Sequence, residues 1–354
     1  MAKKKWMIYG ANGYTGELIA RQAKELGMDV ILGGRNGPAV EKLARELGFS
    51  PRIFGLDDAM GIDDNIKDLA LVLHCAGPFV VTSRPMAESC IRTGTHYLDI
   101  TGEIPVYQAL YDLDSAAKKA SVMLLPGVGF DIVPTDCMAA ELKYRMKDAA
   151  TLRLGFLALG SLSGGTARSA LLQMGSGLKV RREGQIRTLP HLSLKREVRM
   201  AGKNYTMYAI PWGDVFTSYI STGIPDVEVY SHLPAGQARA MGFMLPLLGF
   251  FEKSGLLKAA SGLAGSLIEG PGETVRESSV SHVWGRVENK KGKSLELEML
   301  TLEGYKFTIE SSLLAVKKTL SGKTKKGFTT PSLAFGRKFV LEVPGTEYRK
   351  FPES

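Results

Sequence analysis

Six short apolar runs alternate with amphipathic stretches over the first 130 residues. The runs lie at 6–9, 28–34, 52–56, 69–75, 96–100 and 122–125. Stretches at 17–26, 83–93 and 107–119 read as helices, with apolar residues at helical spacing. Strands that alternate with helices pair in parallel and carry helices on both faces. The pattern therefore predicts an α/β fold, with a doubly wound parallel sheet as an N-terminal domain over residues 1–130.

The pattern changes after residue 130. Alternating runs at 151–159, 206–210, 217–222 and 227–230 predict strands, and runs at 280–288 and 295–302 flank the hairpin signature Asn289-Lys290-Lys291-Gly292. Residues 305–320 read as a strand followed by a helix. We therefore expect a second, α+β domain over residues 131–326, built on an antiparallel or mixed sheet and serving substrate binding and dimerisation. Residues 327–354 are expected to return to the first domain.

Residues 241–268 form an unusually apolar stretch, in which 241–251 carry no charge. The uncharged runs are too short to span a bilayer, which takes about 20 apolar residues. We expect a buried helical pair or the contact of a homodimer. An apolar lid over the substrate and a peripheral membrane contact remain open alternatives.

Composition narrows the class of protein. Of the 354 residues, 44% are hydrophobic, which is enough to bury the cores of two domains. The three scattered cysteines argue against a disulfide framework and favour a cytoplasmic location. The apolar run near the N-terminus is too short for a signal peptide. Because the five histidines lack metal-ligand spacing, no metal is expected.

The net charge of +9 comes from small basic groups spread along the chain. No group combines a basic helix face with interleaved aromatic residues, so we expect no nucleic-acid partner. The charge fits a solvated surface, and it also suits a cofactor with several phosphates or an anionic membrane.

A glycine-rich turn follows the first predicted strand. Its spacing, glycine at 10, 13 and 16, would let the backbone turn tightly, approach a pyrophosphate and pack the next helix on the sheet. Amide groups at the start of that helix attract an anion. The turn therefore predicts a Rossmann dinucleotide site. The residues expected to bind the cofactor here are Gly10, Asn12, Gly13, Tyr14, Thr15 and Gly16.

An arginine after the second strand selects the cofactor. Sites for NAD(H) usually place an acid there, about 20 residues after the glycines, for the ribose hydroxyls. This chain has Arg35 instead, and the next acid is Glu41. A guanidinium suits a 2′-phosphate. NADP(H) is therefore predicted and NAD(H) is less favoured, with Asp57 after the third strand as a further cofactor residue.

The ends of the later strands should converge on the nicotinamide, because ligands of open parallel sheets lie beyond the carboxyl ends of the strands. Three acids there are candidates for catalysis: Asp99, Glu103 and Asp131. Each has a structural alternative, namely holding ribose hydroxyls, holding the turn, or capping a helix. The cofactor residues expected at these strand ends are Ala76, Gly77, Pro78, Phe79, Gly102 and Gly129.

The chain resembles the saccharopine dehydrogenase-like oxidoreductases, including their trans-acting enoyl reductase branch, over nearly its whole length. The resemblance implies an NAD(P)-binding Rossmann domain, a substrate domain and a C-terminal return. It rests on residues 10–16, 34–35, 76–79 and 97–103, on 129–131 with Pro134 and Asp136, and on 163–166, 212–214, 221–225 and 330–331.

The substrate is less explicit than the cofactor. Ser163, Gly164, Gly165 and Thr166 could cap a helix and present N–H groups to a substrate carbonyl, or form a plain N-cap. Trp212 belongs to a motif of the resemblance and is taken as a substrate residue. A dicarboxylate adduct would require several arginines, of which the candidates are few: Arg84, Arg168, Arg181 and Arg182.

We therefore predict an NADPH-dependent oxidoreductase that transfers a hydride to an apolar substrate of the enoyl or acyl type. One alternative is a dehydrogenase of a saccharopine-type amino-acid adduct. The other is a protein that binds NADP(H) at a lipid surface, or senses it, without catalysis.

Overall fold

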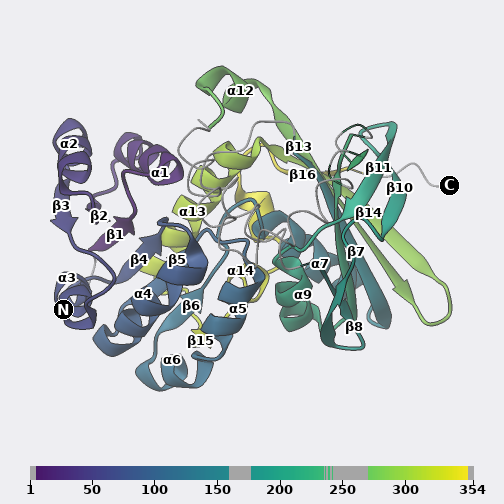
Figure 1. Ribbon diagram of the computed structural model, residues 1–354, viewed down its shortest axis with the longest axis horizontal. Coiled ribbons are helices and arrows are strands. Elements are labelled where there is room, and N and C mark those ends of the chain that lie inside the picture. Colours follow the sequence, from purple (N-terminus) through teal and green to yellow (C-terminus); the bar gives the residue numbers. More distant parts are fainter. Residues whose placement is uncertain are drawn as a thin grey trace. The chain divides into compact units, whose positions relative to one another are not determined.

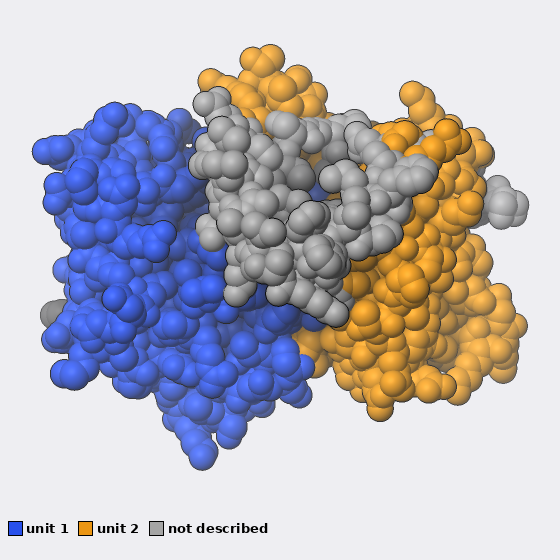
Figure 2. Space-filling model, in the orientation of Figure 1, with its two compact units in different colours: residues 1–133, 305–336 blue, residues 134–304, 337–354 orange. Residues whose placement is uncertain are grey.

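The chain crosses three times between two structural units. The computed structural model describes residues 5–158, 177–234 and 270–349, together with Gly236, Ala238, Arg239 and Met241. Unit 1 comprises residues 1–133 and 305–336, and unit 2 comprises residues 134–304 and 337–354 (Figure 2). These boundaries differ from the expected ones: residues 305–326 group with unit 1, and residues 337–354 group with unit 2.

Unit 1 is built on a seven-stranded sheet of order β15-β6-β5-β4-β1-β2-β3 (Figure 1). All of its strand pairs are parallel. Strands β1, β2, β4 and β6 are buried on both faces, which explains why they read as continuous apolar runs. The strands are β1 (Trp6–Tyr9), β2 (Ile31–Gly34), β3 (Ser50–Ile53), β4 (Leu71–His74), β5 (His96–Asp99), β6 (Met123–Leu125) and β15 (Gly327–Phe328).

The order of the first six strands is that of the Rossmann fold, so the expected doubly wound sheet is confirmed. Its reversal point lies between β1 and β4, where such folds bind dinucleotides. The helices of this unit are α1 (Tyr14–Glu25), α2 (Gly37–Leu47), α3 (Ala59–Ile66), α4 (Phe79–Thr93), α5 (Ile104–Tyr111), α6 (Asp114–Ala120), most of α13 (Gly304–Leu320) and α14 (Pro331–Phe335).

Three expected elements have different bounds. The helix expected at 107–119 is two helices, α5 and α6, and the one expected at 83–93 begins at Phe79. The stretch expected as strand and helix at 305–320 belongs to the single helix α13.

Unit 2 is built on a nine-stranded mixed sheet, as expected for the second domain. Its path runs β10-β11-β12-β7-β13-β14-β16, and β8 pairs with β12 and β9. The strands are β7 (Ala149–Ala158), β8 (Leu178–Arg182), β9 (Gln185–Leu189), β10 (Lys195–Met200), β11 (Lys203–Ala209), β12 (Asp226–His232), β13 (Val280–Asn289), β14 (Ser294–Leu302) and β16 (Glu347–Arg349).

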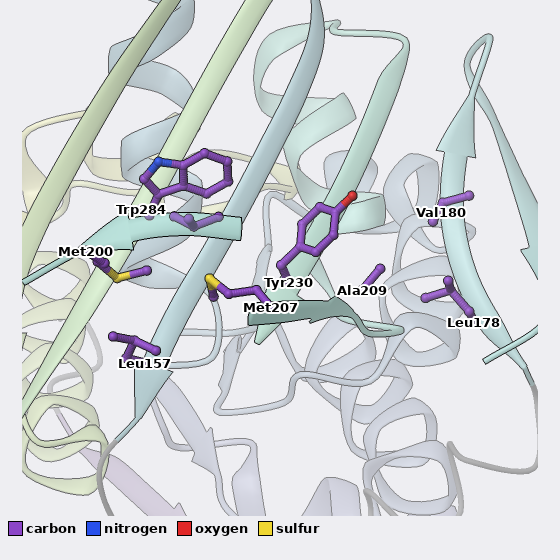
Figure 3. Packing of buried hydrophobic residues seen from close by; sticks show 9 residues of the cluster. Leu157, Leu178, Val180, Met200, Met207, Ala209, Tyr230 and Trp284 are labelled. Atoms are coloured by element: carbon purple, nitrogen blue, oxygen red, sulfur yellow. The ribbon is translucent and has the colours of Figure 1, made fainter. Parts of the chain in front are cut away.

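Buried hydrophobic side chains from several strands of unit 2 pack into one cluster. Leu157, Tyr230 and Trp284 come from β7, β12 and β13, and Met200 and Met207 come from β10 and β11 (Figure 3). The tip of the β10–β11 hairpin reaches β14, where the Ala201 N–H donates to a carboxylate oxygen of Glu298 at 2.9 Å. The helical elements of this unit are α7 (Val133–Arg145), α9 (Asp214–Thr222), α12 (Glu273–Ser278) and the 3₁₀ helix η1 (Phe339–Glu342).

The strand expected at 217–222 is wrong, because these residues lie in α9. The β-branched residues of this segment favour a strand, but the residues at its two ends favour a helix. Asp214 lies in the first turn, where its charge suits the helix dipole, and Gly223 ends the helix in the left-handed region at φ 69°. The hairpin around Asn289 is confirmed as β13 and β14. Within the described residues, no helix is long and apolar enough to cross a membrane.

One carboxylate helps to hold the chain where it returns to the sheet of unit 1. Strand β15 adds to the edge of the sheet beside β6, and the Phe328 N–H donates to Asp114 of α6 at 2.9 Å. The same carboxylate pairs with Lys118 at 2.7 Å.

We expect Asp114→Ala to lower the free energy of unfolding by about 1–3 kcal/mol, because the backbone N–H of the buried residue Phe328 loses its acceptor. Urea denaturation measures this change. The control is Asp112→Ala, which removes only an exposed acceptor for Gln108 and should change stability by less than about 0.5 kcal/mol. Equal losses in both variants would contradict this role of Asp114.

Candidate functional site

The turn between β1 and α1 accepts only glycine at two positions. Gly10 has φ +82°, and a Cβ added there would lie 2.7 Å from the backbone nitrogen of Ala76. A Cβ at Gly16 would lie 2.3 Å from the carbonyl oxygen of Gly10. The Gly13 N–H closes the turn on that same oxygen at 3.0 Å. Asn12 and Gly13 are exposed at its tip, so the turn has the bare, close-packed backbone that a pyrophosphate requires.

Among helices α1 to α4, α1 has no capping side chain. Asn36 accepts from the Ala39 N–H at the start of α2, and Asp58 accepts from the Met60 N–H at the start of α3. A carboxylate from another segment occupies the start of α4, as described below. The first turn of α1, which contains Tyr14 and Thr15, therefore offers the N-terminal anion site of this edge.

Arg35 lies directly after β2 and is exposed. Burial raises the pKa of the nearby Tyr9 to about 12, the positive charge of Arg35 opposes this rise, and the negative charge of Asp57 adds to it. Both charges therefore lie close to Tyr9, whose hydroxyl donates to the carbonyl of Phe54 at 3.0 Å. The Asn12 side chain lies against Gly34 at the end of β2. These residues surround the place where the adenosine ribose lies in this fold.

Glu103 is buried and holds the start of α4. Its carboxylate accepts from the backbone N–H groups of Phe79 at 3.4 Å and Val80 at 3.0 Å. It thereby fixes the turn of Ala76, Gly77 and Pro78 that follows β4, in which the Gly77–Pro78 bond is cis. The contacts favour the structural alternative for Glu103 over a catalytic role, because its oxygens face helix N–H groups.

Asp99 is fully buried and joins the ends of β5 and β6. Its carboxylate accepts from the N–H groups of Thr101 and Gly127, each at 2.9 Å, and from the Tyr97 hydroxyl at 2.8 Å. Burial raises its pKa to about 7, although the three donors act in the opposite direction. The expected catalytic use of Asp99 therefore finds no support in its contacts, which favour a role in holding the turn.

Asp131 differs from the other two acids because it is partly exposed. It lies against Gly102, where an added Cβ would be 2.8 Å from a carboxylate oxygen. Burial of the carboxylate raises its pKa to about 7, and the negative charge of Glu103 adds to this rise. Of the three acids expected at this edge, Asp131 alone combines partial exposure of the residue with a pKa raised to about 7, and its catalytic role stays a prediction.

Several residues that position the site carry no signal in the sequence. The His74 ring at the end of β4 lies 2.9 Å from the Thr82 hydroxyl, and burial lowers its pKa to about 3. The Tyr107 hydroxyl donates to the Thr101 carbonyl at 2.6 Å. Thr308 and Ser311 of α13 bond the loop that contains Gly129, from far along the chain. Thr308 and Ser311 are identified only by contacts between distant segments, whereas His74 and Tyr107 bond residues close to them in the chain.

The residues expected to bind substrate belong to unit 2. Ser163, Gly164, Gly165 and Thr166 lie outside the described residues, as does the apolar stretch 241–268 apart from Met241. Trp212 is partly exposed and packs on Phe156 of β7, with ring centroids 5.0 Å apart. Its assignment to the substrate stays a prediction.

Comparison with known proteins agrees with this geometry. Residues 6–125 match the family described as the saccharopine dehydrogenase NADP binding domain. This part of the chain is thus similar to the NADP-binding domain of saccharopine dehydrogenases. The match covers β1 to β6 and thus every described cofactor residue except Gly129. The expected NADP(H) cofactor is therefore supported by the family as well as by Arg35.

Relatives extend the similarity beyond the NADP-binding domain. The chain is 26% identical over 240 residues to the saccharopine dehydrogenase-like oxidoreductase of Rattus norvegicus, covering 58% of this chain and 56% of that protein. It is 29% identical over 155 residues to the trans-acting enoyl reductase of Mycobacterium leprae, covering 41% of this chain and 37% of that protein. The chain thus spans about half the length of the mammalian relative and a smaller part of the bacterial one.

The fold as a whole matches a solved structure. Saccharopine dehydrogenase (L-Glu forming) from Saccharomyces cerevisiae superposes with a TM-score of 0.66, covering 98% of this chain and 100% of that chain. At 13% identity this likeness concerns the fold alone.

We expect Arg35→Ala to weaken NADPH binding by about 10- to 100-fold, because a charge-assisted contact to the 2′-phosphate is lost. Binding of NADH, which lacks that phosphate, should change less than about threefold. Titration calorimetry with both cofactors measures this difference. Arg45→Ala, in the last turn of α2, is the control. An equal loss for NADH and NADPH would overturn the assignment.

Asp131 should make stability depend on pH. Because its pKa is higher in the folded chain than in the unfolded one, the folded state holds the proton more tightly, and stability falls as pH rises from about 4 to about 7. Asp131→Asn removes this term, so the variant should gain stability over the wild type as pH rises through this range. Thermal unfolding at a series of pH values measures it, with Asp112→Asn as the exposed control. A pH-independent difference would contradict the raised pKa.

Proposed function

We propose that the protein is an NADPH-dependent oxidoreductase that reduces an apolar, unsaturated acyl substrate. The observation that carries this proposal is the placement of Asp131. Asp131, a partly exposed residue whose buried carboxyl group has a pKa raised to about 7, lies at the same sheet edge as the bare glycine turn. A group with such a pKa is suited to general acid catalysis.

The chain's own residues bind the cofactor and supply the proton. Gly10, Gly13 and the first turn of α1 bind the pyrophosphate, and Arg35 binds the 2′-phosphate. The cofactor, when bound, supplies a hydride to the β-carbon of the conjugated double bond. Protonated Asp131 donates its proton to the α-carbon, directly or through a water molecule, and is reprotonated from solvent. The C=C bond becomes a single bond, NADPH becomes NADP⁺, and one proton is consumed.

Of the four candidate arginines, Arg168 lies outside the described residues, and the partners of the other three disfavour a substrate with two carboxylates. Arg84 pairs with Glu88 at 2.8 Å, and Arg182 pairs with Glu228. Arg181 donates to the backbone carbonyls of Val215 and Gly184 and lies over the Tyr219 ring at 4.3 Å. These guanidinium groups are already engaged. An adduct of the saccharopine type would require such groups for its carboxylates.

Two exposed apolar residues support the acyl substrate. Val80 and Val81 lie in the first turn of α4, beyond the carboxyl end of β4, and are 48% and 65% exposed. Apolar surface at a ligand-binding edge gains free energy when a hydrocarbon chain covers it. The name of the enoyl reductase among the relatives agrees with this substrate class.

The apolar stretch 241–268 supports a further part of the proposal. It would form a homodimer contact or touch a membrane surface peripherally. The three free cysteines fit a chain that works in the cytoplasm.

The test is NADPH oxidation with a medium-chain 2-enoyl thioester and, in parallel, with a glutamate–lysine adduct. We expect turnover of the thioester alone. Asp131→Asn should lower kcat by about 10²- to 10⁴-fold while the Kd of NADPH changes less than about threefold. Asp112→Asn is the control.

Turnover of the adduct alone would favour the amino-acid dehydrogenase. Tight NADPH binding without turnover of either compound would favour a sensor. Either outcome overturns the proposed reaction.

A further inference from the structure

Helix α13 (Figure 1) begins where the chain re-enters unit 1, and its side chains contact two segments, which follow β6 and β1. One is the loop after β6 that ends in Asp131. The other is the start of α1, which follows the glycine turn. Neither the comparisons nor the proposed reaction assigns a role to this helix.

Two hydroxyl groups hold the loop after β6. The Phe130 N–H donates to the Thr308 hydroxyl at 3.0 Å, and the Ser311 hydroxyl donates to the Val128 carbonyl at 2.7 Å. Thr308 packs so closely on Gly129 that an added Cβ there would lie 2.9 Å from its methyl group. The backbone on both sides of Gly129, at Val128 and Phe130, is therefore bonded to one helix. Phe130 directly precedes Asp131 in the chain.

Two aromatic contacts extend this attachment. The Phe307 ring packs edge-on against Phe130, with centroids 5.9 Å apart. The Tyr305 ring packs edge-on against Tyr14 in the first turn of α1, with centroids 5.1 Å apart. One rigid helix thus contacts both the element that binds the pyrophosphate and the loop that contains the acid. Residues 305 and 311 lie about 9 Å apart along its axis.

We infer that α13 sets the distance between the cofactor and the acid, and that Thr308 is a positioning residue for Asp131. This inference rests on the proposed function. A helix can keep the two segments at a fixed distance because its backbone hydrogen bonds fix its length. A loop that is bonded only to itself can change its position. Hydride and proton transfer require fixed geometry, and a displacement of about 1 Å can cost 10²-fold in rate.

The variants distinguish an effect on the position of Asp131 from an effect on the stability of the folded protein. Thr308→Val keeps the shape of the side chain but removes the acceptor of the Phe130 N–H, and Thr308→Ser restores the hydroxyl. The control is Thr319→Val on the same helix. Thr319 is also buried, but its hydroxyl bonds only the Ala315 carbonyl one turn earlier.

Three quantities are measured: amide hydrogen exchange of residues 128–131, the Kd of NADPH, and kcat against pH with the enoyl thioester. In Thr308→Val we expect exchange of these amides to rise about tenfold, since a buried donor loses its partner. The Kd of NADPH should stay within about threefold, while kcat falls about 10- to 100-fold.

The pH profile should also change. Burial and the charge of Glu103 act on Asp131 in the held loop. A released loop lies in more water, so the loss of activity at high pH should begin at lower pH. Thr308→Ser should behave as the wild type, and Thr319→Val should change none of the three quantities.

Unchanged exchange in Thr308→Val, or equal effects in Thr319→Val, would overturn the inference. So would faster exchange with an unchanged kcat and pH profile in an active enzyme. A wild type without turnover would instead overturn the proposed function, and the exchange experiment, which needs no substrate, would still decide whether Thr308 holds the loop.

Discussion

The carboxyl edge of the unit 1 sheet depends on one buried carboxylate, that of Asp99. It bonds the backbone of the turn after β5 at Thr101 and the backbone of the loop after β6 at Gly127. The Thr101 hydroxyl then accepts from the Glu103 N–H, and Glu103 accepts from the start of α4. A buried carboxylate is tolerated only when it is well hydrogen-bonded. Because Asp99 meets that condition through two loops at once, the loops keep a fixed separation.

The three carboxylic acids at this edge have different roles because their surroundings differ. Asp99 is saturated by donors and Glu103 faces the N–H groups of a helix, so each is committed to structure. Asp131 is partly exposed, and burial together with the charge of Glu103 holds its pKa near neutrality. Glu103 thereby serves the site twice, because it caps α4 and also makes the loss of a proton from Asp131 less favourable.

Local patterns predicted what local sequence determines. The six apolar runs are each local, and they predict the six strands that form. The glycines at 10, 13 and 16 and Arg35 are equally local, and their binding of the cofactor stays a prediction. The roles of the acids depend on pairings across the sheet, which no segment contains: Glu103 meets N–H groups that lie 23 and 24 residues earlier in the chain. The alternating run at 217–222 predicts a strand, but Asp214 in the first turn and Gly223 at the C-cap favour the helix α9 that forms.

The membership of α13 in unit 1 is the extreme case of this limit. Phe130 and Thr308 are 178 residues apart, with most of unit 2 between them. A chain that ended at residue 133 would contain the glycine turn, Arg35 and all three acids, yet it would lack the hydroxyls that hold the last loop and the strand β15 that covers the sheet edge. Residues 1–133 therefore contain the motifs but lack the contacts that α13 and β15 supply. The motifs predict where the cofactor binds, and hydrogen bonds from the returning helix α13 hold the loop that ends in Asp131.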